Sequence, residues 1–372
     1  MRETESRIDG WFDMALIGVF AVAIFVSFAV IVFETDPVIS GSEKRILAEW
    51  PGLPRTFKAV EEFPQRFNAY ADDRFGLRST FLHLDCLLKW RLGLQISPKV
   101  LTGKDGWLFL GEHSNVVDQH RGIDRFEGED LHRWVSAMVE RQEWLAERSI
   151  PFIVVVAPNK HSIYPEYLPK TIGPVVGETR LDQLVDYIKE HTDLDFIDLR
   201  GPVLEAKESG IVFFKTDSHW NDVGGFAGYR ELVKRIKRYC PEVGSVTLND
   251  YSRQLREWKG DLVQMLNLQG VVSEYASALI PKHPTPVCLE MVFGPGGSEV
   301  LHRMYCTTLF SELPTVVIFH DSSIWGMFKF LYEGFHRTIM VPHSVTKFDT
   351  ALIEKEKPDI VIYELIERAV GA

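Results

Sequence analysis

The feature of this sequence that most restricts its fold is a repeated alternation of helical patterns with short, mostly apolar runs. Apolar residues recur at helical spacing between 131 and 145, and five consecutive apolar residues follow. A helix that leads into a strand buried on both faces is typical of α/β proteins. The sequence therefore predicts a doubly wound, mostly parallel sheet. The runs expected to form its strands are Phe152–Val156, Phe196–Leu199, Thr315–Phe319 and Ile360–Tyr363.

An acid and a histidine lie two residues apart where the apolar residues Phe213 and Phe214 give way to a predicted helix from 223 onward. Asp217 can hold one ring nitrogen of His219 and leave the other free as a base. The alternatives are an ordinary solvated loop and a metal site. A catalytic zinc needs about three protein ligands, and no His-x-x-x-His or Glu-x-x-His spacing supplies them, so no metal is expected.

A matching nucleophile is expected about a hundred residues further on. The β-branched run Thr315–Phe319 ends at a polar corner that contains Ser322 and Ser323. This pattern predicts a strand that delivers a serine to a strand-to-helix turn. Ser322 is the first candidate and Ser323 the alternative. A hydroxyl at a helix start is also commonly an N-cap, so a structural role for either serine stays open.

Further short motifs accompany these residues in a fixed order. They are Glu43-Lys44-Arg45, Asp73 to Arg78, Gly103 to Phe109, Pro158-Asn159-Lys160, Ile163 to Glu166, Lys215 to Asp222, Gly260-Asp261-Leu262, His320-Asp321-Ser322, Lys357 to Val361 and Glu367-Arg368. This ordered set resembles the SGNH-hydrolase-like domain of the alginate O-acetyltransferases of the AlgJ and AlgX type, over residues 43–368.

The resemblance implies an SGNH-like fold with Ser322 as nucleophile, His219 as general base and Asp217 as the acid that orients it. The acid and base precede the serine, as in this acetyltransferase family and unlike ordinary SGNH esterases. His320 stands where the wider pattern has a glycine, which leaves the register between Ser322 and Ser323 open.

Four further residues are candidates for oxyanion or substrate binding. The Ser322 backbone N–H is the first expected oxyanion donor, and Asn159 and Asn221 are candidates for the second, with a structural amide as the alternative for each. Trp220 is a candidate for stacking on a sugar ring, with packing over His219 as the alternative. Tyr164 belongs to a resembling stretch, and its role is left open.

The N-terminal region predicts a membrane anchor within residues 1–36. Met14–Phe33 holds twenty consecutive uncharged residues. At about 1.5 Å per residue this stretch matches a hydrocarbon core of roughly 30 Å. A cleaved signal peptide is the rival, but the apolar region is too long and no small-x-small cleavage site follows it. Arg2 and Arg7 before the span favour a cytoplasmic N-terminus, so we expect a single-pass inner-membrane protein with its folded part in the periplasm.

The remaining chain is expected to contain two parts. Residues 37–100 predict a helical juxtamembrane spacer, whose apolar and aromatic stripe breaks near residues 72–76. Residues 101–372 predict the catalytic domain, with an insertion of turns and short strands at 251–303, where proline and glycine are frequent.

Composition narrows the functional classes. The net charge of −11 supplies no clustered positive charge for nucleic acid. The four cysteines have no metal-type spacing; Cys288 and Cys306 are candidates for a disulfide, and free thiols are the alternative.

Together with the predicted membrane anchor, the resemblance implies a membrane-anchored O-acetyltransferase that acts on an alginate-like exopolysaccharide. The alternatives are an acetyl-esterase of the same fold and a non-catalytic polysaccharide-binding or scaffold subunit. No cofactor motif is present. The resemblance implies a multispanning membrane acyltransferase as the partner that supplies the acetyl group.

Overall fold

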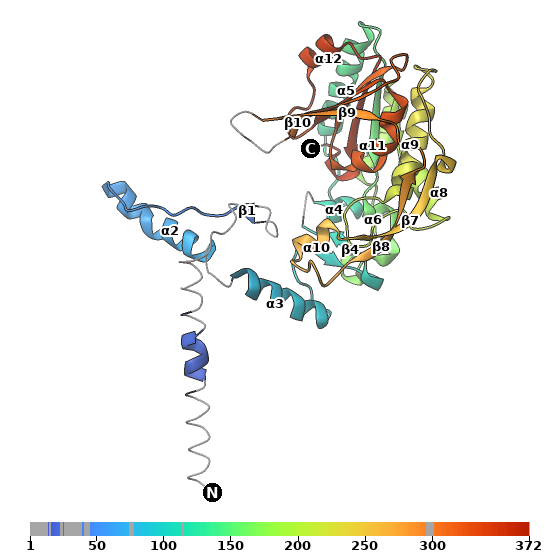
Figure 1. Cartoon of the computed structure of the whole chain (residues 1–372). Helices are drawn as coiled ribbons and strands as arrows, with labels where there is room; N and C mark the ends of the chain where they lie inside the picture. The colour runs from blue at the N-terminus through green and yellow to red at the C-terminus, as the bar shows by residue number, and fades with distance from the viewer. Residues whose placement is uncertain are drawn as a thin grey trace. The chain divides into compact units, whose positions relative to one another are not determined.

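The computed structural model describes residues 14, 16–22, 25, 39–40, 45–73, 78–112, 115–294 and 301–371. The chain divides into two units (Figure 1). One comprises Met1–Ile96 with Val263–Val271, and the other comprises Ser97–Leu262 with Val272–Ala372.

The larger unit is built on a seven-stranded sheet of order β6-β5-β13-β11-β12-β10-β9. The first five strands in this order are parallel, whereas β10 is antiparallel to both β12 and β9. The expectation of a mostly parallel sheet is therefore wrong in this respect, because the sheet is mixed. The strands are β5 (Phe152–Ala157), β6 (Phe196–Asp198), β9 (Val287–Phe293), β10 (Leu301–Thr308), β11 (Thr315–His320), β12 (Arg337–Pro342) and β13 (Ile360–Ile366).

Helices cover both faces of this sheet, as the alternating pattern predicts. Successive residues of a strand point to opposite faces, and β5 sends Ile153 and Val155 into one hydrophobic cluster and Val154 and Val156 into the other. The first cluster includes apolar residues of α8 (Arg200–Lys207), α9 (Asp222–Ile236) and α11 (Trp325–Leu331). The second includes those of α5 (Asp130–Ala146), α7 (Arg180–His191) and α12 (Thr350–Glu356).

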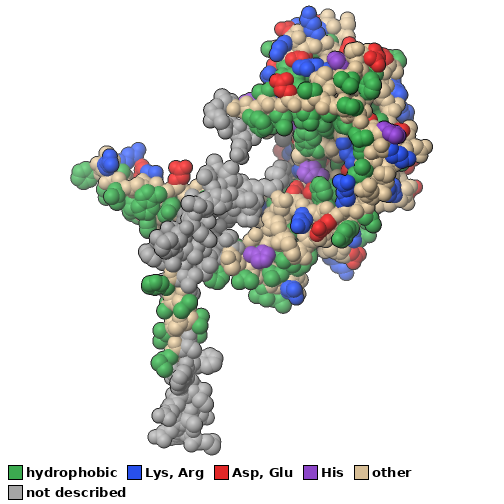
Figure 2. All heavy atoms as spheres, in the orientation of Figure 1, with side chains coloured by type: hydrophobic (Ala, Val, Ile, Leu, Met, Phe, Trp, Pro, Cys, Tyr) green, Lys and Arg blue, Asp and Glu red, His purple; other side chains and the backbone are tan. Residues whose placement is uncertain are grey.

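The region expected as an insertion of turns and short strands has more regular structure than predicted. β7 (Tyr251–Trp258) and β8 (Glu274–Pro281) form a separate antiparallel pair, and β9 and β10 extend the central sheet. Hydrophobic side chains are exposed on β9, which lies at the edge of the sheet, and they gather on the surface where β9 and β10 lie (Figures 1 and 2). Smaller elements are β3 (Val100–Thr102), β4 (Leu108–Leu110), α4 (Val116–His120), α6 (Lys160–Ile163) and α10 (Asp261–Met265).

The cysteines on β9 and β10 do not form the suggested disulfide. Cys306 pairs with Leu289, and Cys288 pairs with Thr307. Since Cys288 and Leu289 are consecutive, the register places Cys288 and Cys306 on opposite faces of the sheet. Both are free thiols, Cys288 exposed and Cys306 buried.

The smaller unit contains the two helices predicted for the spacer, α2 (Phe57–Asp73) and α3 (Arg78–Arg91), and a short pair of strands, β1 (Ile39–Ser40) and β2 (Arg45–Ile46). The aromatic stripe contacts itself, with Trp50 against Phe67 and Tyr70. It does not form an enclosed core, because α2 has no buried residue.

The predicted membrane span, 14–33, lies largely outside the described residues. Within the described ranges, no helix combines the length and apolar character needed to cross a bilayer.

Candidate active site

Three of the predicted residues meet at one edge of the sheet. Nε2 of the His219 ring lies 2.9 Å from Oγ of Ser322, and Nδ1 of the same ring lies 2.7 Å from Oδ1 of Asp217. The serine is exposed, whereas the aspartate is buried. The arrangement is therefore a hydroxyl, a base and an orienting carboxylate in line, with the hydroxyl at the solvent end.

Local structure explains why the loop presents His219 in this way. Phe213 and Trp220 form an isolated β-bridge that closes a narrow loop around residues 214–219. Asn221 then caps α9, since its side-chain oxygen accepts hydrogen bonds from the backbone N–H groups of Val223 and Gly224. The loop is fixed at both of its ends.

The carboxylate of Asp217 accepts four hydrogen bonds. Oδ1 accepts from the backbone N–H and the ring of His219, and Oδ2 accepts from Trp258 Nε1 and the backbone N–H of Asp261, both at 3.1 Å. Burial alone would raise the pKa of Asp217, but the hydrogen bonds and charge of His219 outweigh it and hold the pKa well below its usual range. Asp217 is thus ionised whenever His219 is needed as a base.

Opposing effects act on the proton affinity of His219. Burial lowers the pKa of His219, whereas the hydrogen bond and charge of Asp217 and the charge of Asp261 raise it, and the net result is a pKa above 6.5. The positive charge of Arg368 acts in the lowering direction.

The turn after β11 separates the two candidate serines. Ser322 faces His219, whereas Ser323 is buried, and its Oγ lies 2.5 Å from both Asp321 Oδ1 and Glu364 Oε1. Burial, with the charge of Asp321, raises the pKa of Glu364 well above its usual value. A serine hydroxyl has only one proton to donate. Glu364 therefore keeps its proton and donates to Ser323, which donates to Asp321.

His320, at the position where the wider pattern has glycine, is also buried. Its Nδ1 lies 2.8 Å from the backbone oxygen of Asp321, and its ring packs edge-on against Trp325. Burial lowers the pKa of His320 to about 4, so the ring is neutral at physiological pH.

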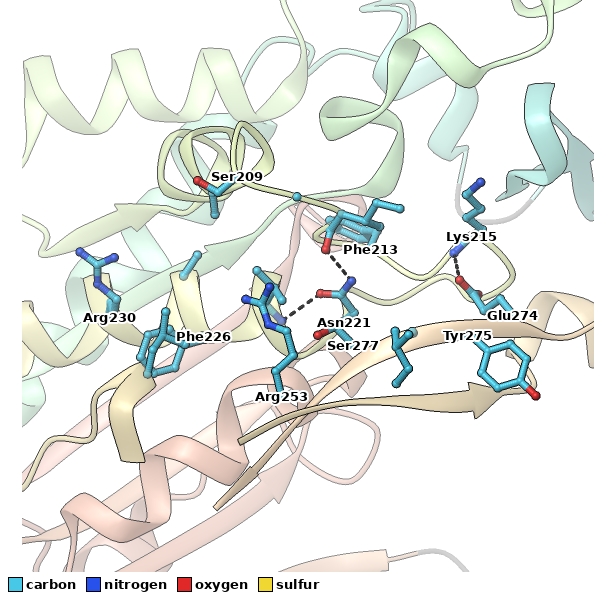
Figure 3. Close-up of a pocket in the computed structure, with 18 residues that line it drawn as sticks. Ser209, Phe213, Lys215, Asn221, Phe226, Arg230, Arg253, Glu274, Tyr275 and Ser277 are labelled. Atoms are coloured by element: carbon cyan, nitrogen blue, oxygen red, sulfur yellow. Dashed lines mark hydrogen bonds between the residues drawn. The ribbon is translucent and has the colours of Figure 1, made fainter. Parts of the chain in front are cut away.

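The other predicted site residues lie in different surroundings. Asn221 is engaged at both ends of its amide, because Nδ2 also donates to the backbone oxygen of Ile211 at 2.7 Å (Figure 3). Trp220 is buried and donates from Nε1 to the backbone oxygen of Ser323. Tyr164 is buried too, and its hydroxyl accepts from the backbone N–H of Val212. The polar atoms named here therefore already have partners within the protein.

Asn159 differs from these three, because its amide nitrogen makes no hydrogen bond within the described part of the chain. The residue is buried and follows the carboxyl end of β5. Its backbone N–H donates to Glu367 Oε2 at 2.7 Å, and its Oδ1 accepts from Arg368 Nη1 at 3.2 Å. The amide N–H groups are left available.

Lys160 fixes the backbone of the loop that carries Asp217 and His219. Its Nζ donates to the backbone oxygens of Leu108, Lys215 and Asp217 at 2.6, 2.8 and 3.0 Å. An ammonium group has three protons to donate, so each one has an acceptor. Burial lowers the pKa of Lys160 to about 7, against the opposing charges of nearby carboxylates. The side chain ties β4 to the backbone of the orienting aspartate.

The loop is also held from β8, where Glu274 accepts from the backbone N–H group of Lys215, as drawn in Figure 3, and from that of Thr216. A hollow of about 600 Å³ lies on this side, bordered by Lys215, Asn221 and residues of β7 and β8. Neither His219 nor Ser322 lines it, so we assign it no chemistry.

Asp217, His219 and Asp261 form a group of the kind that can hold a metal ion, with one ligand atom from each within 4.8 Å of the others. Four N–H groups already point at the carboxylate of Asp217, and Asp261 accepts from the backbone and hydroxyl of Ser218. A cation would have to displace these donors. The group is suited to orienting an imidazole.

Sequence reasoning missed several residues that surround the site. Trp258 and Asp261 come from one segment, and Glu364 and Arg368 from another. The only signal for Asp261 and Arg368 was membership of the resembling motifs. Their roles depend on contacts across the fold.

Comparisons with known proteins agree with this architecture. The family described as "SGNH hydrolase-like domain, acetyltransferase AlgX" matches residues 100–288. The match includes Asp217 and His219 and ends before Ser322.

Curated relatives carry the name "Probable alginate O-acetylase AlgJ". The chain is 25% identical over 209 residues to the protein from Pseudomonas aeruginosa, a match that covers 56% of this chain and 51% of the relative. It is 28% identical over 238 residues to the protein from Pseudomonas fluorescens, covering 62% of this chain and 54% of the relative. The chain thus spans about half the length of the curated relatives it matches.

Solved structures share the fold at low sequence identity. PatB1 of Bacillus cereus has a TM-score of 0.53 and 16% identity, covering 73% of this chain and 97% of that chain. A DHHW family protein from Eubacterium siraeum has a TM-score of 0.53 and 15% identity, covering 74% of this chain and 96% of that chain. The SGNH-like α/β fold predicted from the sequence is confirmed, and the chain belongs to the family of the SGNH hydrolase-like domain of the acetyltransferase AlgX.

Proposed function

We propose that this protein is an O-acetyltransferase that places acetyl groups on hydroxyls of an alginate-like polysaccharide outside the cytoplasm. The observation that carries the proposal is the line of hydrogen bonds from Ser322 Oγ through the His219 ring to Asp217. The names of the curated relatives support the acyl group and the class of acceptor.

The first half of the reaction forms an acyl-enzyme. Nε2 of His219 removes the hydroxyl proton of Ser322 while Oγ attacks the carbonyl carbon of the acetyl donor. The carbonyl electron pair moves onto oxygen, and the resulting tetrahedral intermediate then expels the donor's alcohol, which takes the proton from His219. Asp217 stabilises the imidazolium that forms between these steps.

We propose that two groups bind the negative oxygen of that intermediate. Ser322 is the first residue of a short helix, Ser322–Ile324, where a backbone N–H has no partner within the helix. The amide nitrogen of Asn159 is the second donor. Donors of this kind stabilise the oxyanion and not the ground state, so each is worth roughly 10²–10³ in rate.

The second half transfers the acetyl group to the acceptor. His219 removes a proton from a sugar hydroxyl, whose oxygen attacks the acetyl carbon attached to Ser322 Oγ. The serine leaves with the proton returned by His219. The exposed position of Ser322 gives a large acceptor access to this atom.

The cellular setting is part of the proposal. The apolar segment 14–33 anchors the chain in the inner membrane, and residues beyond it lie in the periplasm. As the resemblance to the AlgJ and AlgX type implies, we propose that a multispanning membrane acyltransferase delivers the acetyl group.

Hydrolysis by the same residues is the second candidate. The exposed hydroxyl of Ser322 that admits a sugar also admits water, which yields an acetyl-esterase. A scaffold with an unused triad is the non-catalytic alternative.

One experiment separates these three functions. The purified chain would be given p-nitrophenyl acetate with and without a mannuronate oligosaccharide, and acetate release and acetylated sugar would both be measured. The transferase predicts acetylated sugar at the expense of free acetate. Free acetate alone would indicate an esterase, and no release of p-nitrophenol above that of Ser322→Ala would indicate a scaffold.

A further inference from the structure

Arg368 is a cation with an unusual environment beside the proposed site. Burial lowers its pKa, but an arginine in a protein keeps its charge. The side chain is only partly buried, and the charges of Asp321, Asp261 and Glu367 stabilise its positive charge. Within the described part of the chain, Arg368 forms no ion pair, and its only side-chain hydrogen bond is the one to Asn159 Oδ1. Its guanidinium group therefore donates to one neutral side chain, next to the residues that carry the proposed chemistry.

The sheet explains why Arg368 and Asn159 meet. β5, β13 and β11 are adjacent parallel strands, and residues that follow their carboxyl ends share one edge of the sheet. Asn159 follows β5, Arg368 follows β13 and Ser322 follows β11. The backbone N–H of Ile366 donates to Asp321 Oδ2 at 2.6 Å, which ties the end of β13 to the serine turn.

Two consecutive residues hold Asn159 at its two polar ends. Glu367 accepts the backbone N–H of Asn159 and also the hydroxyl of Ser162. Arg368 donates to the side-chain oxygen. The backbone of Asn159 and its amide plane are therefore fixed from the same segment.

A guanidinium group can only donate hydrogen bonds, so only the oxygen of the Asn159 amide can face it. The NH₂ group must then point in the other direction. Rotating the amide by half a turn would bring two sets of N–H groups together and lose a charge-assisted hydrogen bond. The amide nitrogen has no partner within the described residues although Asn159 is only 3% exposed.

We propose that Arg368 is a positioning residue, which fixes the Asn159 amide so that its NH₂ group is the second oxyanion donor. This inference rests on the proposed acyl transfer at Ser322. Arg368 itself does not touch the reacting atoms. Its contribution to rate passes through Asn159.

A double-mutant cycle tests this dependence. The enzyme and the variants Asn159→Ala, Arg368→Met and the double variant would be compared by kcat and KM for p-nitrophenyl acetate. Each single change should lower kcat by about 10²–10³-fold with little change in KM. The double variant should be no slower than the slower single variant, because the two residues act as one unit.

Three further variants sharpen the cycle. Asn159→Asp keeps an acceptor for Arg368 but removes the donor, so it should be as slow as Asn159→Ala. Arg368→Lys keeps a donor and should recover part of the lost kcat. Arg238→Met removes an exposed arginine near the end of α9 and should leave kcat unchanged.

A purely structural role for Arg368 predicts another outcome. Effects of Arg368→Met and Asn159→Ala that multiply in the double variant, or full activity of Arg368→Met, would overturn the inference. If Arg368→Met does not fold, the other variants still test the inference. An unchanged kcat in both Arg368→Lys and Asn159→Ala would overturn it. Loss of activity in Ser322→Ala with a multiplicative cycle would leave the proposed function intact and reject only the role of Arg368.

Discussion

Two neighbouring serines on one turn lie in opposite environments. Ser322 Oγ is exposed and contacts Nε2 of His219. The other ring nitrogen, Nδ1, is held by the ionised carboxylate of Asp217. Ser323 Oγ is buried between two carboxyl groups, one of which keeps its proton. Each serine belongs to its own hydrogen-bond network that includes acids: Ser322 with His219 and Asp217, and Ser323 with Asp321 and Glu364. Only the network of Ser322 contains a base next to an exposed hydroxyl.

The difference shows what makes a hydroxyl reactive. A serine needs a base that can take its proton and open space where an ester can approach. Asp321 and Glu364 give Ser323 neither of these, since one acid holds the hydroxyl proton in place and the other donates a proton of its own. The network of Ser323 stabilises the turn, and the network of Ser322 performs the proposed chemistry.

The largest effect should come from exchanging the first serine. Ser322→Ala should lower kcat for p-nitrophenyl acetate by about 10⁴–10⁶-fold, because the nucleophile is lost. Ser323→Ala should leave kcat within about tenfold but lower the free energy of unfolding by about 1–3 kcal/mol, because the buried Glu364 and the partly buried Asp321 lose their partner. Steady-state kinetics and urea unfolding measure the two effects. The reverse pattern would exchange the assigned roles of the serines.

The orienting acid should have the next largest effect. Asp217→Asn should lower kcat by about 10³–10⁴-fold, because the amide no longer stabilises the imidazolium or holds the reactive tautomer. The matched change in the network of Ser323, Asp321→Asn, should mainly lower the free energy of unfolding. Equal losses of kcat in both variants would remove the distinction between the two networks.

The pH dependence of activity should follow His219. Only the neutral ring accepts a proton, and Asp217 raises the pKa of His219 above 6.5. Activity should therefore be lost on the acid side around a pKa higher than 6.5, as measured in a profile of kcat/KM against pH. Since Arg368 is among the charges that lower this pKa, Arg368→Met should move the acid limb to higher pH. An acid limb below pH 6.5 would contradict the assigned surroundings of the ring.

The smallest effect is expected at Glu364. Its pKa in the folded protein lies well above 4.5, so between 4.5 and that pKa the folded state binds a proton that the unfolded state does not. Stability should then fall as pH rises through this window. Glu364→Gln imitates the protonated acid, so it should cost less than about 1 kcal/mol and flatten this dependence. If Glu364 were ionised in the folded protein, unfolding curves at several pH values would show no fall in the stability of the unmodified protein through this window.

Part of this comparison could be predicted from the sequence. Ser322 follows an apolar run that forms β11, so its position at the carboxyl edge of the sheet could be inferred from the local pattern. Asp217 and His219 follow Phe213 and Phe214, which form an isolated bridge and not a strand of the sheet, so their pairing with each other could be predicted but not their place beside Ser322. The choice between Ser322 and Ser323 could not, because consecutive residues in a tight turn differ only in the direction of their side chains. That direction depends on β13, which brings the carboxyl group of Glu364 into hydrogen-bond contact with the hydroxyl of Ser323.

Contacts across the fold account for what the sequence did not reveal. Trp258 and Asp261 reach Asp217 from the region expected as an insertion, and no spacing relates them to it. Trp220 and Asn221 are residue types that often bind substrates, but their polar groups have structural partners. Trp220 donates to the backbone oxygen of Ser323, and Asn221 caps the start of α9. The mixed sheet escaped prediction because frequent prolines and glycines near β9 indicated turns.

The most direct test of the central claim is to find which serine carries the acyl group. The protein would be mixed with p-nitrophenyl acetate, quenched in acid and digested, and the acetylated residue would be located by tandem mass spectrometry. The account predicts an acetyl group on Ser322 that disappears when the mannuronate oligosaccharide is added before quenching. Acetylation of Ser323, or full turnover by Ser322→Ala without acetylation of Ser322 in the native protein, would contradict it.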